Sequence, residues 1–422
     1  MKISKNIKNK IKHTLSKIPA LDLFVRKKVT PLLSDKYDKQ YSSSEVIENQ
    51  FLFECFKGKF FNDSPLSLYK ELKSSHKGFK FIWVVNDYKW LILNLHNQDV
   101  LDICLDNNTT IVKYGSDEYL EAYATSKYWV TNCRVPFRVT KKEEQIFIQC
   151  WHGTPLKKMA HDIKVGSNAK TSLDGLKFAY DHEVSRLDYF LSPSSYASKC
   201  FCSSFNMDES KILELGYPRN DKLLVEKNNF EIQKQIKKHL GIEDSKQVIL
   251  YAPTWRDDKV CSVNGHHILT NPLDSESFLS KFKDAVFLYR GHYFTKPDSE
   301  MIEFIDVSHV NDINDLFLIS DVLITDYSSL FFDFANLEKP IYFYMPDLEE
   351  YRDKTRGFYL DVYRELPGPI ASNPDELASY MLRESFDYSV FDSFNKKYNT
   401  YEDGKSSNRV IKALGLSDDA NG

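Results

Sequence analysis

The sequence predicts an α/β protein of two doubly wound domains that face each other across a cleft. Its 422 residues are too many for one ordinary core and suit about two domains, at roughly 150 residues each. Short apolar segments alternate with amphipathic stretches of helical length, which is typical of strand-helix units around a parallel sheet. A charged stretch rich in Lys, Glu and Gln, residues 225–245, separates two such series. In folds of this kind, ligands bind beyond the carboxyl ends of the strands.

Short apolar segments in both halves of the chain are expected to be buried strands. In the first half they are residues 79–85, 110–113, 128–131, 146–150, 189–192 and 212–215. In the second half they are residues 248–251, 286–289, 322–325 and 341–344, with helices expected at 313–320 and 329–336. We therefore predict a basic segment at 1–45, which runs into a polar connector around 34–48, and two Rossmann-like domains at 46–235 and 236–422.

The N-terminal segment carries most of the asymmetry in charge. Residues 1–30 contain nine basic side chains and one acidic side chain, a net charge of +8 in a chain whose total is −4, so the remainder carries −12. Apolar residues recur between these lysines at helical spacing, at Ile3, Ile7, Ile11, Leu15 and Ile18. The pattern predicts a basic amphipathic helix that lies on an anionic membrane surface. A solvated helix docked on the protein's own core is the alternative.

Composition excludes several classes of protein. The total charge of −4 argues against a nucleic-acid binder, for which a strong basic excess is expected. The seven cysteines include no Cys-x-x-Cys pair, which argues against a disulfide framework or a structural zinc site and favours a reducing compartment. No apolar run reaches the roughly 20 residues that span a bilayer, and none resembles a signal peptide. The protein is therefore expected in the cytoplasm.

The first candidate site follows the predicted strand at 146–150. That strand delivers His152 to the carboxyl edge of its sheet, Gly153 tolerates an unusual backbone, and Pro155 suits the first position of a following helix. His152 is thereby aimed into the cleft as a candidate general base. A structural histidine is the alternative.

The second candidate site follows the predicted strand at 322–325. Ser328 or Ser329 begins a helix whose free N–H groups suit a phosphate, although N-capping alone would also explain one serine. Asp333 lies between phenylalanines, beyond the expected first turn, where a carboxylate is costly unless it binds something. A ribose diol is a natural partner, because a carboxylate accepts hydrogen bonds from both hydroxyls.

Two further strand ends carry cationic groups to the same edge of the second domain. Arg290 with His292 follows one predicted strand, and Arg256 follows another. A basic pair at such an edge indicates a clamp for a diphosphate leaving group. For Arg256, an exposed ion pair with Asp257 or Asp258 is the alternative, and because these two acids lack a third at useful spacing, no metal site is predicted.

The motifs of several common enzyme classes are missing from the sequence. There is no Gly-x-Gly-x-x-Gly, no Gly-x-x-x-x-Gly-Lys-Ser/Thr, no Gly-x-Ser-x-Gly and no His-Glu-x-x-His. Dinucleotide-dependent oxidoreductases, P-loop NTPases, lipases and zinc proteases are therefore disfavoured.

Taken together and in order, the motifs resemble the CDP-glycerol glycerophosphotransferase family, which primes or polymerises teichoic acids and some capsule polymers. The matching segments are 151–155 with Lys157, 216–221 with Arg219 and Asp221, 251–256, 290–292, 325–329 with Asp333, 339–340 and 356–359. The resemblance covers about half of the chain. It implies a GT-B fold, in which 46–235 binds the acceptor and 236–422 binds the nucleotide donor.

The resemblance also implies a reaction and roles for the matching residues. An acceptor hydroxyl attacks the β-phosphorus of CDP-glycerol, and CMP leaves. His152 and His292 are the expected catalytic residues, and the donor is expected to contact the residues Arg256, Arg290, Thr325, Ser328, Ser329 and Asp333. Lys157, Arg219 and Asp221 are expected to line the cleft or the acceptor site. No metal or other cofactor is expected.

The partners implied by the resemblance are CDP-glycerol, a lipid-linked or polymeric acceptor and an anionic membrane surface, with the enzyme held at the cytoplasmic face. Several alternatives remain open at the level of sequence. The donor could be CDP-ribitol, the enzyme could be a GT-B glycosyltransferase that uses a nucleotide sugar, or the chain could be a non-catalytic membrane scaffold. Motifs alone do not distinguish a primase from a polymerase.

Overall fold

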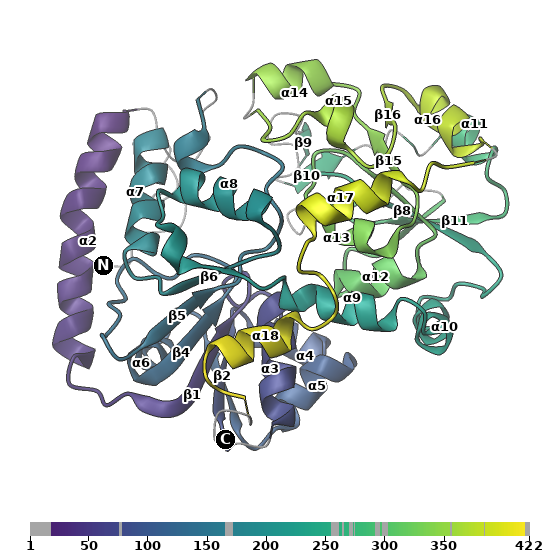
Figure 1. Ribbon diagram of the computed structural model, residues 1–422. Helices are drawn as coiled ribbons and strands as arrows, with labels where there is room; N and C mark the ends of the chain where they lie inside the picture. The colour runs from purple at the N-terminus through teal and green to yellow at the C-terminus, as the bar shows by residue number, and fades with distance from the viewer. Residues whose placement is uncertain are drawn as a thin grey trace.

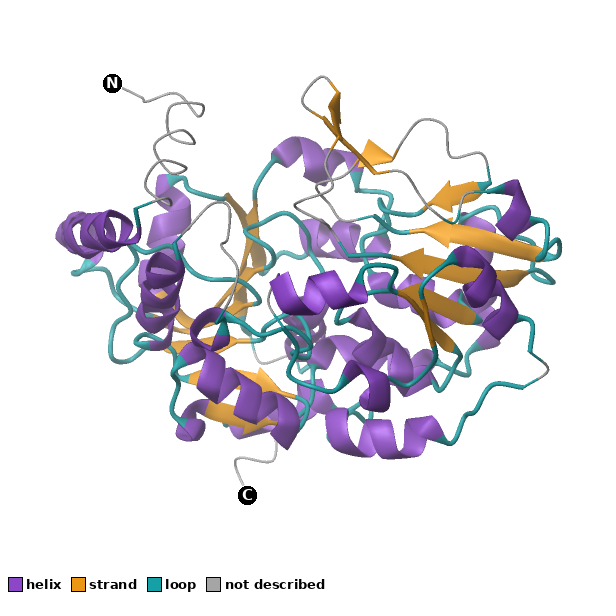
Figure 2. Cartoon of the chain, turned by 90° about the horizontal axis from the view of Figure 1, so that it is seen from above, coloured by secondary structure: helices purple, strands orange, loops and turns teal. Residues whose placement is uncertain are grey.

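The computed structural model has two parallel sheets, each flanked by helices, in two halves that lie side by side (Figure 1). It describes residues 18–75, 78–164, 172–254, 261–263, 266–269, 273, 275–291, 296–297, 303–354, 357–383 and 385–417. The predicted α/β class and the arrangement of two doubly wound domains are confirmed. Viewed from above, helices lie on both sides of the strands in each half (Figure 2).

The first half is built on a sheet of seven strands in the order β3-β2-β1-β4-β5-β6-β7, all paired in parallel. The strands are β1 (Ile47–Glu54), β2 (Lys80–Val85), β3 (Thr109–Lys113), β4 (Ser126–Thr131), β5 (Ile146–Gln149), β6 (Tyr189–Ser192) and β7 (Ile212–Glu214). Its helices are α2 (Pro19–Tyr41), α3 (Asp63–Ser74), α4 (Tyr88–Leu93), α5 (Gln98–Leu105), α6 (Asp117–Thr125), η1 (Ala160–Asp162), α7 (Leu173–Val184), α8 (Ser195–Phe205), η2 (Glu209–Lys211), η3 (Pro218–Asn220) and α9 (Asp221–Glu226).

The second half is built on a parallel sheet of six strands in the order β13-β11-β8-β14-β15-β16. The strands are β8 (Gln247–Ala252), β11 (Ala285–Tyr289), β13 (Phe304–Asp306), β14 (Val322–Thr325), β15 (Ile341–Tyr344) and β16 (Ile370–Ala371); a small separate sheet contains β9 (Cys261–Val263), β10 (His266–Leu269) and β12 (Lys296–Pro297). The helices of this part of the chain are α10 (Phe230–His239), α11 (Glu276–Leu279), α12 (Ile313–Ile319), α13 (Leu330–Phe334), η4 (Ala335–Leu337), α14 (Leu348–Lys354), α15 (Val362–Glu365), α16 (Pro374–Met381) and α17 (Val390–Tyr398), and they are followed by α18 (Ser406–Ala413), which packs on the first half.

Burial on both faces explains why the strands are apolar throughout. In β1, Leu52 packs into one core cluster while Phe51 and Phe53 pack into the cluster on the other side of the sheet. The same alternation divides β8, where Leu250 and Tyr251 face different clusters. Side chains alternate between the faces of a strand, so a sheet covered on both sides requires an apolar residue at nearly every position.

The strand predictions are confirmed to within a few residues, but the central strand of the first sheet is missing from them. β1 lies between β2 and β4, and the predicted polar connector at 34–48 is wrong, because it covers the end of α2 and the start of β1. Polar side chains at 49–50 interrupt the apolar run of β1. Gln50 is nevertheless buried, and it donates hydrogen bonds to Thr125 and Ser126.

The N-terminal helix α2 is anchored to the first half by a buried carboxylate. Asp22 accepts hydrogen bonds from the Ser172 hydroxyl at 2.7 Å and from Arg26 Nε at 2.8 Å, and farther along the helix Tyr37 and Tyr41 are buried. α2 stands at the outer side of the molecule beside α7 (Figure 1). The predicted amphipathic pattern at residues 3–15 lies outside the described residues.

The end of the chain returns to the first half. α18 packs against α3, and its Val410 and Ile411 join the core cluster of Phe51 and Phe53 (Figure 1). Asp221 fixes this return, because its carboxylate accepts hydrogen bonds from the backbone N–H groups of the first two residues of α18 at 2.8 and 2.7 Å. The segment 236–422 therefore does not pack as one separate unit, and its last helix belongs to the first core.

Candidate active site

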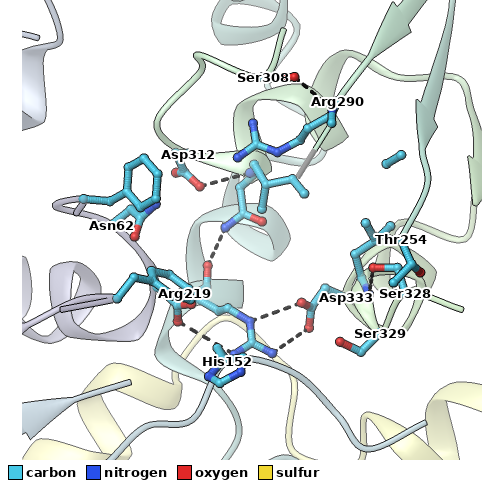
Figure 3. Close-up of a pocket in the computed structure, with 18 of the residues that line it drawn as sticks. Asn62, His152, Arg219, Thr254, Arg290, Ser308, Asp312, Ser328, Ser329 and Asp333 are labelled. Atoms are coloured by element: carbon cyan, nitrogen blue, oxygen red, sulfur yellow. Dashed lines mark hydrogen bonds and ion pairs between the residues drawn. The ribbon is translucent and has the colours of Figure 1, made fainter. Parts of the chain in front are cut away.

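The candidate site is a pocket of about 280 Å³ between the two halves. The first half contributes residues that follow β1 and β5 together with Arg219, and the second half contributes residues that follow β8, β11, β13 and β14. The pocket therefore lies beyond the carboxyl ends of parallel strands from both sheets, as expected for doubly wound folds. Figure 3 shows Asn62 on one side, Ser328 on the opposite side and His152 below them.

His152 is held in one orientation by the backbone. Its Nδ1 lies 2.8 Å from the carbonyl oxygen of Asn132, and because a carbonyl oxygen only accepts, Nδ1 carries the proton and Nε2 of the neutral ring is free to act as a base. The side chain is exposed to the cleft, but the surrounding protein removes much of its water. This desolvation lowers the pKa of His152 below its usual 6.5, while the Asn132 carbonyl and the carboxylate of Asp63 act in the opposite direction.

The turn that presents His152 differs in detail from the prediction. The unusual backbone is at Trp151, with φ of 53°, and not at Gly153. Gly153 instead allows the two halves to approach, because a Cβ at this position would lie 2.4 Å from Oγ of Ser329. The helix predicted to begin at Pro155 is absent: the next residues have no regular secondary structure, and Lys157 forms an isolated antiparallel bridge with Phe358 before η1 begins.

Arg290 lies in the wall that the second half contributes. Its Nη1 donates to the carbonyl of Val310 at 2.9 Å, and the neighbouring Gly291 N–H donates to the hydroxyl of Ser308 at 2.8 Å. Burial lowers the pKa of Arg290 to about 10, although nearby carboxylates, Asp312 first among them, oppose the shift. The guanidinium therefore remains cationic at neutral pH and faces a pocket where an anion would be stabilised.

Ser328, Ser329 and Asp333 line the same wall after β14. The helix that follows is shorter than predicted, because α13 comprises Leu330–Phe334 and continues only as the 3-10 turn η4. Asp333 consequently lies in the first turn, where the helix dipole favours an acid, so the expectation that it lies beyond the first turn is wrong.

Asp333 also has a protein partner that the sequence did not reveal. Arg219 donates Nε to Oδ2 at 3.1 Å and Nη2 to Oδ1 at 3.0 Å, and Asn220 donates to Oδ1 at 2.9 Å (Figure 3). The guanidinium stacks on the ring of Tyr217, 3.9 Å from its centroid. The side chain of Arg219 is 6% exposed. This ion pair joins the two halves directly beside His152.

Some of the predicted site residues lie elsewhere. Thr325 is fully buried, and its hydroxyl donates to the carbonyl of Ala252 at 2.8 Å, so it ties β14 to β8 and does not line the pocket. Lys157 is not among the lining residues, and Asp221 caps α18. His292 and Arg256 lie outside the described residues. Of the predicted residues, the pocket brings together His152, Arg219, Arg290, Ser328, Ser329 and Asp333.

The loop at residues 55–63, which follows β1, is the part of the pocket that the sequence did not predict. It contributes Phe56, Phe60, Asn62 and Asp63 to the lining. The available signal was the run Phe-Leu-Phe followed by a glycine within six residues, a strand-then-turn pattern. The polar residues within β1 hide the strand in the sequence, and with it the position of this loop at the carboxyl end of a strand.

The described part of the chain holds neither a cluster of metal-binding side chains nor a helix that could cross a membrane. Within it, no three or more His, Cys, Asp or Glu side chains are grouped as metal ligands. None of the described helices combines the length and the apolar character that a membrane crossing requires.

The comparison with protein families decides the affiliation. The family model of CDP-glycerol:poly(glycerophosphate) glycerophosphotransferases matches residues 37–415. The chain belongs to this family. The predicted resemblance is thereby confirmed, and the match also covers residues 37–150, which precede the first of the matching motifs.

Individual relatives agree with this affiliation. The chain is 36% identical to the teichoic acid glycerol-phosphate transferase of Staphylococcus aureus over 416 residues, which cover 96% of this chain and 99% of the relative. It is 36% identical over 384 residues to the teichoic acid poly(glycerol phosphate) polymerase of Staphylococcus epidermidis, covering 89% of this chain but 51% of the relative. The chain thus spans about half the length of some relatives and nearly all of others.

Solved structures support the fold. A structure of the wall teichoic acid polymerase TagF has a TM-score of 0.81 and 33% identity, with 98% of both chains covered. A UDP-GlcNAc 2-epimerase from Neisseria meningitidis, 12% identical with a TM-score of 0.50, covers 87% of this chain and 100% of its own, and shares the fold alone. The predicted GT-B arrangement is confirmed.

Proposed function

We propose that the chain transfers glycerol phosphate from CDP-glycerol to a hydroxyl of a membrane-linked or polymeric acceptor and releases CMP, in the synthesis of teichoic acid or a related polymer. One observation carries the proposal: in a member of this family, a histidine with a free Nε2 shares one pocket with the cation Arg290 and the hydroxyls of Ser328 and Ser329. A TagF structure soaked with CDPG has also been solved.

In this proposal, His152 is the general base. Its Nε2 takes the proton of the acceptor hydroxyl as the oxygen attacks the β-phosphorus of CDP-glycerol. A new P–O bond forms to the acceptor, the bond between the β-phosphorus and the bridging oxygen breaks, and CMP leaves with that oxygen. The lowered pKa keeps the imidazole neutral, and therefore basic, at neutral pH.

The second half holds the donor in this proposal. Arg290 and the hydroxyls of Ser328 and Ser329 stabilise the charge that develops on the diphosphate. Asp333 uses the lone pairs left over from its bonds with Arg219 and Asn220 to accept from the ribose hydroxyls. His292 remains a proposed catalytic residue and Arg256 a proposed donor contact, by the order of motifs in the sequence.

Glycerol phosphate is favoured over ribitol phosphate by the extent of the similarity. The relatives that use glycerol phosphate match at 34–36% identity over 87–97% of this chain. The ribitol phosphate enzymes match at 29–32% over 66–70%. The epimerase from Neisseria meningitidis shares only the fold, so it does not favour nucleotide-sugar chemistry.

The first prediction concerns this choice of donor. Incubated with a glycerol phosphate oligomer as acceptor, the full chain should release CMP from CDP-glycerol at least about tenfold faster than from CDP-ribitol, since placing a polyol of the wrong length misaligns the phosphorus. Chromatography of CMP measures both rates, and mass spectrometry of the acceptor shows the added unit. Faster release from CDP-ribitol would contradict the choice of glycerol, and no release from either would contradict the reaction.

We also propose that α2 contributes to peripheral binding at the cytoplasmic face of the membrane. α2 packs on α7, and it exposes large apolar side chains at Leu21, Phe24, Val29, Leu32 and Leu33, with Ile18 exposed just before the helix. Most of these recur every three or four residues and therefore share a face. Lys27 and Lys28 are exposed on the same helix, and the charge of +8 on residues 1–30 suits anionic lipids.

The second prediction tests this surface. The double variant Phe24→Ser and Leu32→Ser removes side chains that are 58% and 67% exposed, so the fold should survive. Burying such a side chain contributes about 1.5–3 kcal/mol, and binding to vesicles of phosphatidylglycerol and phosphatidylcholine should fall at least about tenfold in a sedimentation assay. These substitutions leave the anchoring Asp22 intact, which a deletion of residues 1–30 would remove.

The matched control for this test is Phe230→Ser on α10. Its side chain is 77% exposed but lies on the other half of the molecule, so vesicle binding should be unchanged. Equal binding by the α2 variant and the wild type would rule out the proposed contact.

A further inference from the structure

The loop after β1, taken as residues 55–63 so that it includes Asp63, the first residue of α3, has an unusual backbone. Phe56, Lys57 and Asp63 have φ of 46°, 60° and 60°, and Gly58 has φ of 72°. Positive φ is costly for residues with a side chain and is found mainly where the surrounding structure imposes it at functional sites. At Gly58 a side chain is excluded altogether, because a Cβ would lie 2.7 Å from the backbone nitrogen of Asn86.

The loop is fixed at both ends by hydrogen bonds. At its start, the N–H of Phe56 donates to Oδ1 of Asn132 at 2.8 Å, and the carbonyl of the same Asn132 holds His152. At its end, Asn62 donates to the carbonyl of Asn311 at 2.7 Å, and Asn311 donates to the carbonyl of Phe61 at 2.7 Å. The loop is therefore set relative to His152 on one side and to the second half on the other.

The base of the loop rests on a buried carboxyl group. Glu54, the last residue of β1, is fully buried and accepts hydrogen bonds from the hydroxyls of Tyr119 and Tyr123 at 2.9 and 2.8 Å. Burial raises the pKa of Glu54 to about 7 despite these bonds. Glu54 does not line the pocket, so it supports the loop and does not itself face a ligand.

Four side chains of the loop line the pocket: two are aromatic rings, one is an amide and one is a carboxylate. The ring of Phe56 lies 5.8 Å from the imidazole of His152 and 6.1 Å from the ring of Phe60, so the two rings form an apolar wall next to the base. Asp63 lies on the same wall, with its Oδ1 3.8 Å from Nη1 of Arg219, too far for a hydrogen bond. Nη1 of Arg219 and Oδ1 of Asn62 are both buried, and neither has a hydrogen-bond partner.

The loop also lies opposite the groups assigned to the donor. Arg290, Ser328 and Ser329 belong to the second half, whereas the loop belongs to the first half, and Figure 3 shows Asn62 of the loop on one side of the pocket and Ser328 and Ser329 on the other. An in-line attack on the β-phosphorus requires the acceptor to enter from the side away from the leaving group. With the leaving group held by Arg290 and the serines, as the proposed function has it, the loop is on the acceptor's side of the pocket.

We propose that residues 55–63 form the acceptor subsite and bind the terminal polyol of the acceptor, an inference that rests on the proposed function. Phe56 and Phe60 pack against the carbon chain of the polyol. Asp63 accepts a hydrogen bond from the hydroxyl next to the attacking one, and thereby selects which hydroxyl is presented to Nε2 of His152. Asp63 is a specificity residue in this assignment, and no proton is transferred to it.

The third prediction follows from this division of roles. The experiment uses a saturating concentration of CDP-glycerol and varies the concentration of a glycerol phosphate oligomer. Phe60→Ala and Phe56→Ala should each raise the KM for this acceptor about tenfold, which corresponds to the upper end of the free energy that one aromatic contact contributes. Asp63→Asn should lower kcat at least about tenfold with a smaller change in KM, because the hydroxyl is still bound but is misoriented. The Kd of CDP-glycerol, measured by calorimetry, should stay within about twofold in all variants.

Controls separate this inference from folding and from the proposed function. Phe230→Ala, at an exposed position outside the pocket, should behave as the wild type. Thermal melting should show that the Phe56 and Phe60 variants are folded. These two variants test the subsite even if Asp63→Asn, which loses the charge near Arg219, fails to fold. An unchanged acceptor KM in both phenylalanine variants, or an equal loss of donor affinity, would overturn the subsite. If the wild type itself releases no CMP, the proposed function fails and the subsite fails with it.

Discussion

Replacing His152 with alanine should lower kcat for CMP release from CDP-glycerol by about 10²- to 10⁴-fold, the usual contribution of a general base. The structure gives the reason: Nδ1 is occupied by the carbonyl of Asn132, and only Nε2 is available to take the acceptor proton. Donor affinity should change little, because Arg290 and the two serines remain. Stopped-time chromatography of CMP and calorimetry with CDP-glycerol measure the two quantities.

The control for this variant is His161→Ala. His161 forms a pair with Asp181 at 2.7 Å outside the pocket, so the variant should retain the wild-type rate. A rate within about tenfold of the wild type for His152→Ala would remove this histidine from the mechanism and leave His292 as the candidate base.

The pH dependence should have a defined sign. A general base must be neutral, so kcat/KM should fall as the pH decreases through the pKa of His152, and this acid limb should lie below 6.5 because the cleft lowers that pKa. The carboxylate of Asp63 opposes the shift, so Asp63→Asn should move the limb to still lower pH. Movement in the opposite direction would show that another group controls the limb.

Replacing Asp333 with alanine should reduce the free energy of unfolding by about 3–5 kcal/mol, because it leaves the buried guanidinium of Arg219 without its main partner. Arg219 loses two hydrogen bonds of 3.0–3.1 Å and Asn220 loses one of 2.9 Å, and Asp63, at 3.8 Å from Arg219, does not replace them. Urea denaturation followed by circular dichroism measures the change. The double variant Arg219→Met with Asp333→Leu should recover much of it, since a buried pair costs desolvation that an apolar pair avoids.

The control for Asp333 is Asp375→Ala. Asp375 pairs with Lys281 at 2.7 Å, but its side chain is 81% exposed, so the loss should be at most about 1 kcal/mol. Equal and small effects for the two aspartates would mean that the Arg219 ion pair does not stabilise the junction between the halves. A large loss of CDP-glycerol affinity in folded Asp333→Asn would support the proposed ribose contact.

Local patterns predicted much of the fold because they report burial directly. The strands β5, β8, β11 and β14 are short apolar runs at the centres of covered parallel sheets, where both faces demand apolar residues. The residues that follow such strands gather at one edge, which is why His152, Arg290 and Ser328 were found. β1 was not predicted, because polar residues interrupt its apolar run. The hydrogen-bond partners that allow Gln50 to be buried there lie in α6 and β4, far away in the sequence.

By itself, the sequence determined the α/β class, the cleft between two sheets, the family and the histidine, arginine and serines at the strand ends, since each depends on residues adjacent in the chain. Only the tertiary structure decided that Arg219 pairs with Asp333, 114 positions away, that α18 completes the first core, and that residues 55–63 form a wall of the pocket. These contacts depend on how the two halves pack, and buried charges and polar groups take whichever partners that packing brings within reach.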